Sequence, residues 1–111
     1  MDVESRTEDD LLILTPKSER LDASGTVEFK EHVHTLSADH GGRVMLDMAD
    51  IRFLDSSGLG ALVAVMKALG QGRRLELANC APAVMRVLTL TRMDRVFVLR
   101  DPGAPSHGTA A

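Results

Sequence analysis

The chain has no Trp and no Tyr, and three Phe are the only aromatic residues among 111. The hydrophobic core must therefore consist mainly of aliphatic side chains and the six Met. So few aromatics leave little surface on which nucleic-acid bases could stack. Basic residues are not in excess either, because 13 Lys and Arg face 16 Asp and Glu for a net charge of −3. Nucleic-acid binding is thus disfavoured, and we expect a protein partner.

Cysteine is almost absent, and the single Cys80 excludes an intramolecular disulfide, which is consistent with a reducing compartment. The histidines form no metal-binding motif with Cys80, so we expect neither a metal nor a cofactor. We expect all four histidines at the surface: His32, His34, His40 and His107.

No apolar run is long enough to cross a bilayer, and residues 1–6 lack the features of a signal peptide. We therefore expect a cytoplasmic protein without membrane insertion.

The hydrophobic content of 44% over 111 residues suits one domain with its own core. Patterning predicts strands at 3–5, 11–15, 44–48, 74–78 and 96–99, the fourth with one solvent-exposed face. Helices are predicted from about 24 to the glycines at 41–42, from 57 to 69, and from about 82 onward. This β-β-α-β-α-β-α-β order predicts an α/β domain, residues 1–101, with helices covering a mixed sheet. Residues 102–111 have too little apolar content to pack, and we expect a flexible tail.

The spacing of apolar residues also predicts which side of each helix faces the core. For the first helix these are Val27, Phe29, Val33 and Leu36; for the second, Leu59, Leu62, Val63, Met66 and Leu69; for the third, Val84, Val87 and Leu88.

The sequence Asp55-Ser56-Ser57-Gly58-Leu59-Gly60 stands at the start of the second predicted helix. Free backbone N–H groups and the positive end of the helix dipole make this position favourable for an oxygen acceptor or a phosphate. Asp, Ser and Gly are also ordinary capping residues, so the local sequence alone does not require a further function. Gly58 and Gly60 would allow close approach of a partner backbone, or Gly60 would only permit packing against the sheet.

This motif resembles the loop of the STAS family of bacterial anti-sigma factor antagonists, and the resemblance extends over about nine-tenths of the chain. It implies that Ser56 is the phosphorylation target, with Ser57 as the alternative. The family signature Gly-x-Leu/Ile-Asp appears here as Glu19-Arg20-Leu21-Asp22, with Glu in place of Gly. Asp22 keeps the acidic position, which the resemblance places near the Ser56 loop and in the partner contact. Alternatively, Asp22 only caps the helix beginning near Ser24.

The resemblance implies a partner switch. The unphosphorylated surface, made of residues 22 and 55–60, would bind an anti-sigma factor or a related GHKL-type serine kinase; phosphorylation of Ser56 would release it, and a serine phosphatase would reset it. Asp47, Asp50 and Asp55 gather negative charge near the loop, and a phosphate would add roughly −1.5 to −2 units. The alternatives are a partner switch with another output, such as biofilm formation, motility or a response-regulator phosphatase, and a subunit of a lipid-transport complex.

Catalysis by the chain itself is not expected. Ser56 lacks a Gly-x-Ser-x-Gly elbow, and no recognisable motif supplies a His-Asp pair to activate it. A phosphate-binding Walker loop is also missing. A receiver domain would need an acidic pair at the end of its first strand, whereas Asp9 and Asp10 precede the strand that begins at Leu11.

Overall fold

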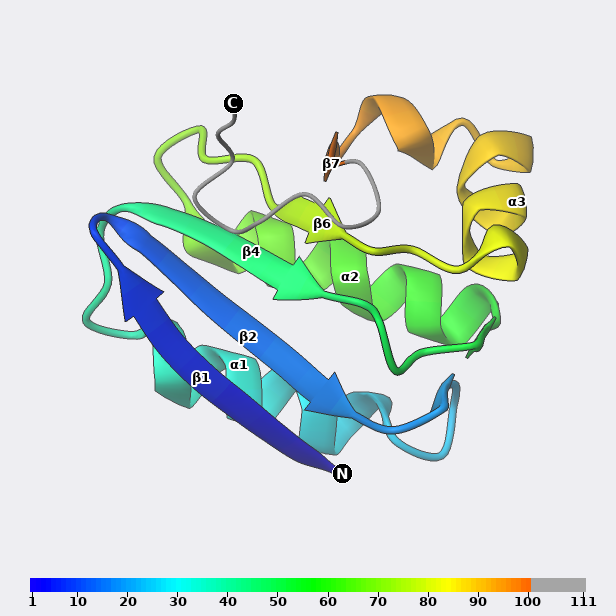
Figure 1. Cartoon of the computed structure of the whole chain (residues 1–111), viewed down its shortest axis with the longest axis horizontal. Helices are drawn as coiled ribbons and strands as arrows, with labels where there is room; N and C mark the ends of the chain where they lie inside the picture. Colours follow the sequence, from blue (N-terminus) through cyan, green and yellow to red (C-terminus); the bar gives the residue numbers. More distant parts are fainter. Residues whose placement is uncertain (101–111) are drawn as a thin grey trace.

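The central sheet has five strands in the order β1-β2-β4-β6-β7 (Figure 1). In the computed structural model, which describes residues 1–100, β1 (Asp2–Glu8) pairs antiparallel with β2 (Leu11–Lys17). The other three pairs are parallel: β2 with β4 (Arg43–Asp47), β4 with β6 (Glu76–Ala78), and β6 with β7 (Val98–Arg100). A two-residue turn joins β1 to β2, with Asp9 at a positive φ of 54° as such tight hairpins require. The predicted mixed sheet is confirmed.

Helices α1 (Thr26–Ser37) and α2 (Ser56–Leu69) lie side by side behind the sheet in Figure 1. α3 (Pro82–Leu90) and a short 3-10 helix (Met93–Arg95) follow β6 and lead into β7. The parallel strands require such crossovers, which explains why strands and helices alternate along the chain. The single α/β domain predicted from the sequence is confirmed. Its main core includes the fully buried side chains Leu14, Leu21, Phe29, Leu46, Met48, Ile51, Leu62, Leu75, Leu77, Val84 and Leu88.

Two short strands, β3 (Arg20–Leu21) and β5 (Phe53–Leu54), form a separate parallel ladder next to α2. Arg20 pairs with Phe53 and Leu21 with Leu54. The strand predicted at 11–15 extends in the structure to Lys17, and Arg20 already begins β3, which was not predicted. Strands of two residues show no alternation of their own, so the sequence pattern could not reveal them.

Two positions predicted to face the core from the first helix are wrong. Phe29 and Val33 are buried, but Val27 is 65% exposed and Leu36 is 36% exposed. Since a helix turns about 100° per residue, Val27 lies about 200° around the axis from Phe29 and cannot share its side. α1 also ends at Ser37, before the predicted stop at Gly41.

The second and third helices agree more closely with the predicted faces. Leu62 and Leu69 are buried, while Leu59, Val63 and Met66 are half-buried and pack against the core. α2 also buries Gly58, Ala61 and Val65. In α3, Val84 and Leu88 are buried and Val87 is half-buried.

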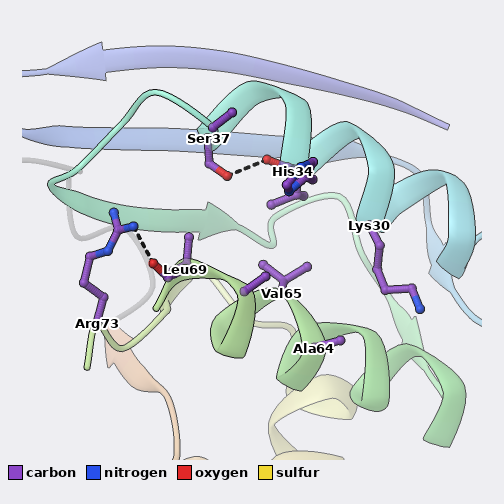
Figure 2. Close-up of a pocket in the computed structure, with 10 residues that line it drawn as sticks. Lys30, His34, Ser37, Ala64, Val65, Leu69 and Arg73 are labelled. Carbon is purple, nitrogen blue, oxygen red and sulfur yellow. Dashed lines mark hydrogen bonds between the residues drawn. The ribbon is translucent and has the colours of Figure 1, made fainter. Parts of the chain in front are cut away.

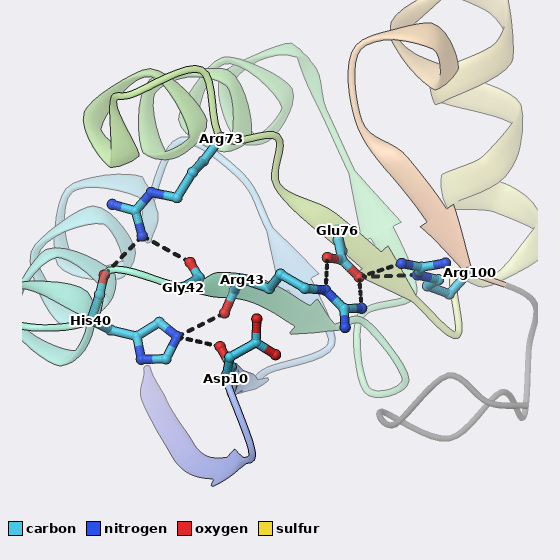
Figure 3. Close-up of polar contacts among 7 residues, drawn as sticks. All are labelled: Asp10, His40, Gly42, Arg43, Arg73, Glu76 and Arg100. Atoms are coloured by element: carbon cyan, nitrogen blue, oxygen red, sulfur yellow. Dashed lines mark hydrogen bonds and ion pairs between the residues drawn. The ribbon is translucent and has the colours of Figure 1, made fainter.

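The exposed face predicted for residues 74–78 is wrong in part: Arg74 is exposed, but the strand β6 begins only at Glu76 and all three of its residues are buried. Glu76 is only 5% exposed and accepts hydrogen bonds from Arg43 of β4 at 2.8 and 2.9 Å and from Arg100 of β7 at 3.0 Å (Figure 3). Burial by itself raises the pKa of Glu76, but these two guanidinium groups outweigh it and hold the pKa below its ordinary value. Glu76 can thus remain charged while buried, because ion pairs with both neighbouring strands compensate its charge.

The histidines are only partly at the surface. His34 is exposed, whereas His32 and His40 are half-buried, and His107 lies outside the described residues. The His40 Nε2 atom lies 2.8 Å from the carbonyl oxygen of Asp10 and 2.9 Å from that of Arg43 (Figure 3). This histidine therefore links the β1–β2 turn to the start of β4. The tail expected at 102–111 also lies outside the described residues.

Candidate functional site

Asp55 is the N-cap of α2, and its Oδ1 atom accepts a hydrogen bond from the backbone N–H of Gly58 at 2.8 Å. Ser56 is the first helical residue, and both Ser56 and Ser57 are exposed. Within the described residues, neither serine hydroxyl makes a hydrogen bond. The cap is therefore supplied by the carboxylate, and the two hydroxyls at the helix entrance remain accessible.

Gly58 joins this loop to the neighbouring ladder. A Cβ at this position would overlap the carbonyl oxygen of Leu21 and lie 2.8 Å from the Leu54 side chain. Gly60 is different, since it is exposed and a Cβ there would meet nothing within 4 Å. Close packing thus explains Gly58 but not Gly60, so the packing role considered for Gly60 is wrong. Leu59, between them, is half-buried and packs against the core.

Asp22 follows β3 and is held by two neighbours. Its Oδ1 atom accepts hydrogen bonds from the Ser24 hydroxyl at 2.7 Å and the Ser24 N–H at 3.1 Å, and its Oδ2 atom accepts one from Arg20 Nε at 3.1 Å. The Ser24 hydroxyl, followed by Arg20, lowers the pKa of Asp22. α1 begins only at Thr26, and Gly25 is its N-cap. Asp22 therefore stabilises the turn before α1 and does not cap the helix itself.

The structure brings this acidic residue to the Ser56 loop through the backbone. Asp22 directly follows Leu21, whose carbonyl oxygen contacts Gly58. Two segments separated by more than thirty residues in the sequence are therefore adjacent at the start of α2.

The other carboxylates near the loop are partly compensated. Asp47 accepts hydrogen bonds from the Ala49 N–H and the Asn79 amide, both at 3.1 Å. Asp50 forms an ion pair with Lys17 at 2.8 Å. The hydrogen bond from Lys17 to Asp50 raises the pKa of the lysine. Asp50 therefore contributes less uncompensated negative charge than the sequence alone indicates.

Two residues that the sequence did not single out lie on the outer side of the β3–β5 ladder. The Arg20 guanidinium carbon is 4.3 Å from the centroid of the Phe53 ring, a cation–π stack. Their ladder partners Leu21 and Leu54 are buried. Since successive strand residues point to opposite sides, Arg20 and Phe53 face outward. Only recognition of the ladder could have linked residues so far apart in the sequence.

A hollow of about 360 Å³ lies between α1 and α2 (Figure 2). Its lining includes Val33, Val65 and Arg73 but none of the predicted site residues. Arg73 donates to the carbonyl oxygens of Leu69, His40 and Gly42 at 2.6, 2.8 and 2.9 Å, so its terminal nitrogens already bind the backbone. We therefore retain the Ser56 loop, and not this hollow, as the candidate site.

Within residues 1–100, no group of three His, Cys, Asp or Glu side chains is placed to hold a metal ion. The same part of the chain has no helix that is both long and apolar enough to span a bilayer.

Comparison with known proteins gives a consistent result. A family model described as "STAS domain" matches residues 2–110. A Thermotoga maritima protein named "Putative anti-sigma factor antagonist" is 32% identical over 95 residues, covering 84% of this chain and 83% of the relative. The crystal structure of such a protein from T. maritima superposes with a TM-score of 0.78 at 27% identity, over 87% of this chain and 84% of the other. The unphosphorylated form of the anti-sigma factor antagonist SpoIIAA, at 17% identity, shares the fold with a TM-score of 0.71 over 90% and 87% of the two chains.

Proposed function

Because this chain belongs to the STAS domain family, we propose that it is an anti-sigma factor antagonist controlled by phosphorylation. Unphosphorylated, it binds an anti-sigma factor that is itself a GHKL-type serine kinase. Phosphorylation of Ser56 releases the partner, and a separate serine phosphatase restores binding. The chain has no catalytic role in this cycle, which takes place in the cytoplasm.

One observation carries the proposal: the Ser56 hydroxyl is exposed at the first position of α2 and is not needed for the cap. A kinase can reach such a hydroxyl without unfolding the helix. Modification also leaves the hydrogen bond between Asp55 and Gly58 in place. The adjacent Ser57 is exposed as well and is the alternative acceptor.

The position also explains how a phosphate could change binding without changing the fold. The first turn of α2 contains no acidic residue, and the positive end of the helix dipole attracts a phosphate there. A partner surface that fits a neutral hydroxyl would instead meet roughly 1.5 to 2 additional negative charges. Asp22 and Asp55, close to the same helix end, would add to the repulsion of an acidic partner surface.

The test uses each GHKL-type serine kinase of the genome of origin, purified and incubated with the full chain and ATP. Mass spectrometry should locate the phosphate on Ser56, and Ser56→Ala should abolish it. Ser57→Ala is the matched control and should be labelled normally. Label that persists in Ser56→Ala and disappears in Ser57→Ala would move the acceptor to Ser57.

Binding is measured separately with the kinase that modifies the chain. Ser56→Asp should weaken binding at least tenfold, while Ser56→Ala should bind like the wild type, and both should melt within a few degrees of it because the residue is on the surface. Equal binding by the wild type and Ser56→Asp would contradict the charge switch.

A further inference from the structure

We propose that the Arg20–Phe53 stack is the anchor of the partner interface, and that it selects a protein partner presenting a carboxylate beside an apolar recess. The inference depends on the proposed function, because it concerns the surface next to Ser56. It adds two residues outside the motif and states the chemistry that the partner must supply.

The first argument is exposure. Phe29 and Phe97 are buried, whereas Phe53 is 41% exposed. Val27, Leu36 and Leu90 are also exposed, but none of them lies next to Ser56 in the sequence or carries a stacked cation within the described residues. Aromatic and Arg side chains dominate the binding energy of protein interfaces. Phe53 is thus the exposed apolar side chain best placed to bind a partner of the Ser56 loop.

The second argument is rigidity. Ser24 fixes Asp22, Asp22 accepts a hydrogen bond from Arg20 Nε at 3.1 Å, and Arg20 lies over the ring of Phe53 at 4.3 Å. The two strands that carry the stack pair through Arg20 and Phe53 themselves. Side chains that are already ordered lose less conformational entropy when they bind. The stack is therefore preorganised for an interface.

The third argument is charge. Arg20 remains 61% exposed, and its terminal nitrogens donate no hydrogen bond within the described residues. These planar donors match the two oxygens of a carboxylate. Arg20 would then lie between two acidic groups, Asp22 of this chain and the carboxylate of the partner. The exposed part of the Phe53 ring would at the same time enter an apolar recess of the partner.

The fourth argument is contiguity with the proposed switch. Gly58 packs on Leu21, which directly follows Arg20, and Phe53 precedes Ser56 by three residues. A phosphate on Ser56 would repel the partner carboxylate that Arg20 attracts. The same carboxylate of the partner would then be attracted by Arg20 and repelled by a phosphate on Ser56.

The experiment measures binding of the full chain to each purified GHKL-type serine kinase of the genome of origin. Arg20→Gln and Phe53→Ala should each raise the Kd at least tenfold. The matched controls are Arg52→Gln, an exposed Arg next to Phe53, and Leu90→Ala, an exposed apolar residue of α3; both should stay within twofold. Arg20→Lys keeps the charge but loses the planar stack, and should fall between Arg20→Gln and the wild type.

Phosphorylation kinetics separate anchoring from a structural effect. Arg20→Gln should raise the KM for phosphorylation of Ser56 without changing kcat, because the guanidinium does not touch the reacting hydroxyl. Circular dichroism checks that each variant is folded; should Phe53→Ala not fold, Phe53→Leu and Arg20→Gln carry the test.

Three outcomes would overturn the inference. Equal weakening by Arg20→Gln and Arg52→Gln would mean a general effect of positive charge. Unchanged binding in both Arg20→Gln and Phe53→Ala, with Ser56→Asp still defective, would reject the anchor and leave the proposed function standing. Failure of the wild type to bind any of the kinases would overturn both.

Discussion

Gly58 lies so close to the carbonyl oxygen of Leu21 that no side chain can be accommodated between α2 and the β3–β5 ladder. Together with the pairing of Leu21 and Leu54 in the ladder, this contact brings the turn carrying Asp22 next to the loop carrying Ser56. Backbone cannot move aside as a flexible side chain can. The position therefore couples the stability of the domain to the shape of the candidate site.

The two glycines in the first turns of α2 should respond in opposite ways to Ala. Gly58→Ala should destabilise the protein by about 2 kcal/mol or more, because its Cβ would overlap the Leu21 backbone. Gly60→Ala should stabilise it by about 0.5–1 kcal/mol, since the space is open and Ala favours the helix. Urea unfolding of both variants measures these changes. Equal effects would mean that the two positions have the same surroundings.

Leu62→Ala should lower the free energy of unfolding by about 3 kcal/mol, because this side chain is fully buried in the main core. Val63→Ala is the neighbouring control, and its half-buried side chain should cost about 1 kcal/mol or less. Denaturant midpoints with unchanged m-values provide the measurement. A larger loss of stability in Val63→Ala than in Leu62→Ala would mean that the wrong side of α2 has been assigned to the core.

Glu76→Gln should destabilise the domain by about 2 kcal/mol at neutral pH, because the hydrogen bonds from Arg43 and Arg100 would lose their charged acceptor. The folded-state pKa of Glu76 lies below its ordinary value of 4.5. Its ionisation therefore stabilises the fold at pH values above 4.5, and this contribution disappears as the pH falls through the folded-state pKa.

Urea unfolding of the wild type and Glu76→Gln at several pH values tests this linkage. The difference between them should be constant above about pH 6 and should shrink toward pH 3. A difference that grew with acidification would reverse the sign of the proposed linkage.

Cys80 should be unreactive in the folded protein. Burial raises the pKa of its thiol to about 11, so little thiolate forms at pH 8. A colorimetric disulfide reagent at pH 8 should label the unfolded chain within minutes and the native chain at least a hundredfold more slowly. Rapid labelling without denaturant would show that the thiol is accessible.

The sequence allowed prediction of the α/β fold and of the α2 entrance because both depend on strong local signals. An apolar stripe of more than three turns follows Ser56, and Asp55 is a favourable capping residue. Ser56 itself remains a predicted acceptor, and the exposure of its side chain is the structural observation in its favour.

The errors arise where distant residues decide the environment. Glu76 alternates with apolar neighbours and so indicates an exposed strand face, yet arginines 33 and 24 residues away bury it. Val27 is a different case, because its spacing of two residues from the buried Phe29 already places it on the other side of the helix. The Arg20–Phe53 stack depends on a pairing of two-residue strands that carries no periodic signal.

The Asp55 cap has one more consequence. Since the Asp55 carboxylate and not a serine hydroxyl caps the start of α2, the proposed phosphorylation and dephosphorylation of Ser56 would leave the hydrogen bond from the Gly58 N–H to Asp55 in place. Each turnover of such a signal would involve no rearrangement of the chain. Its speed would then be set by the enzymes that write and erase the mark and by the encounter with the partner.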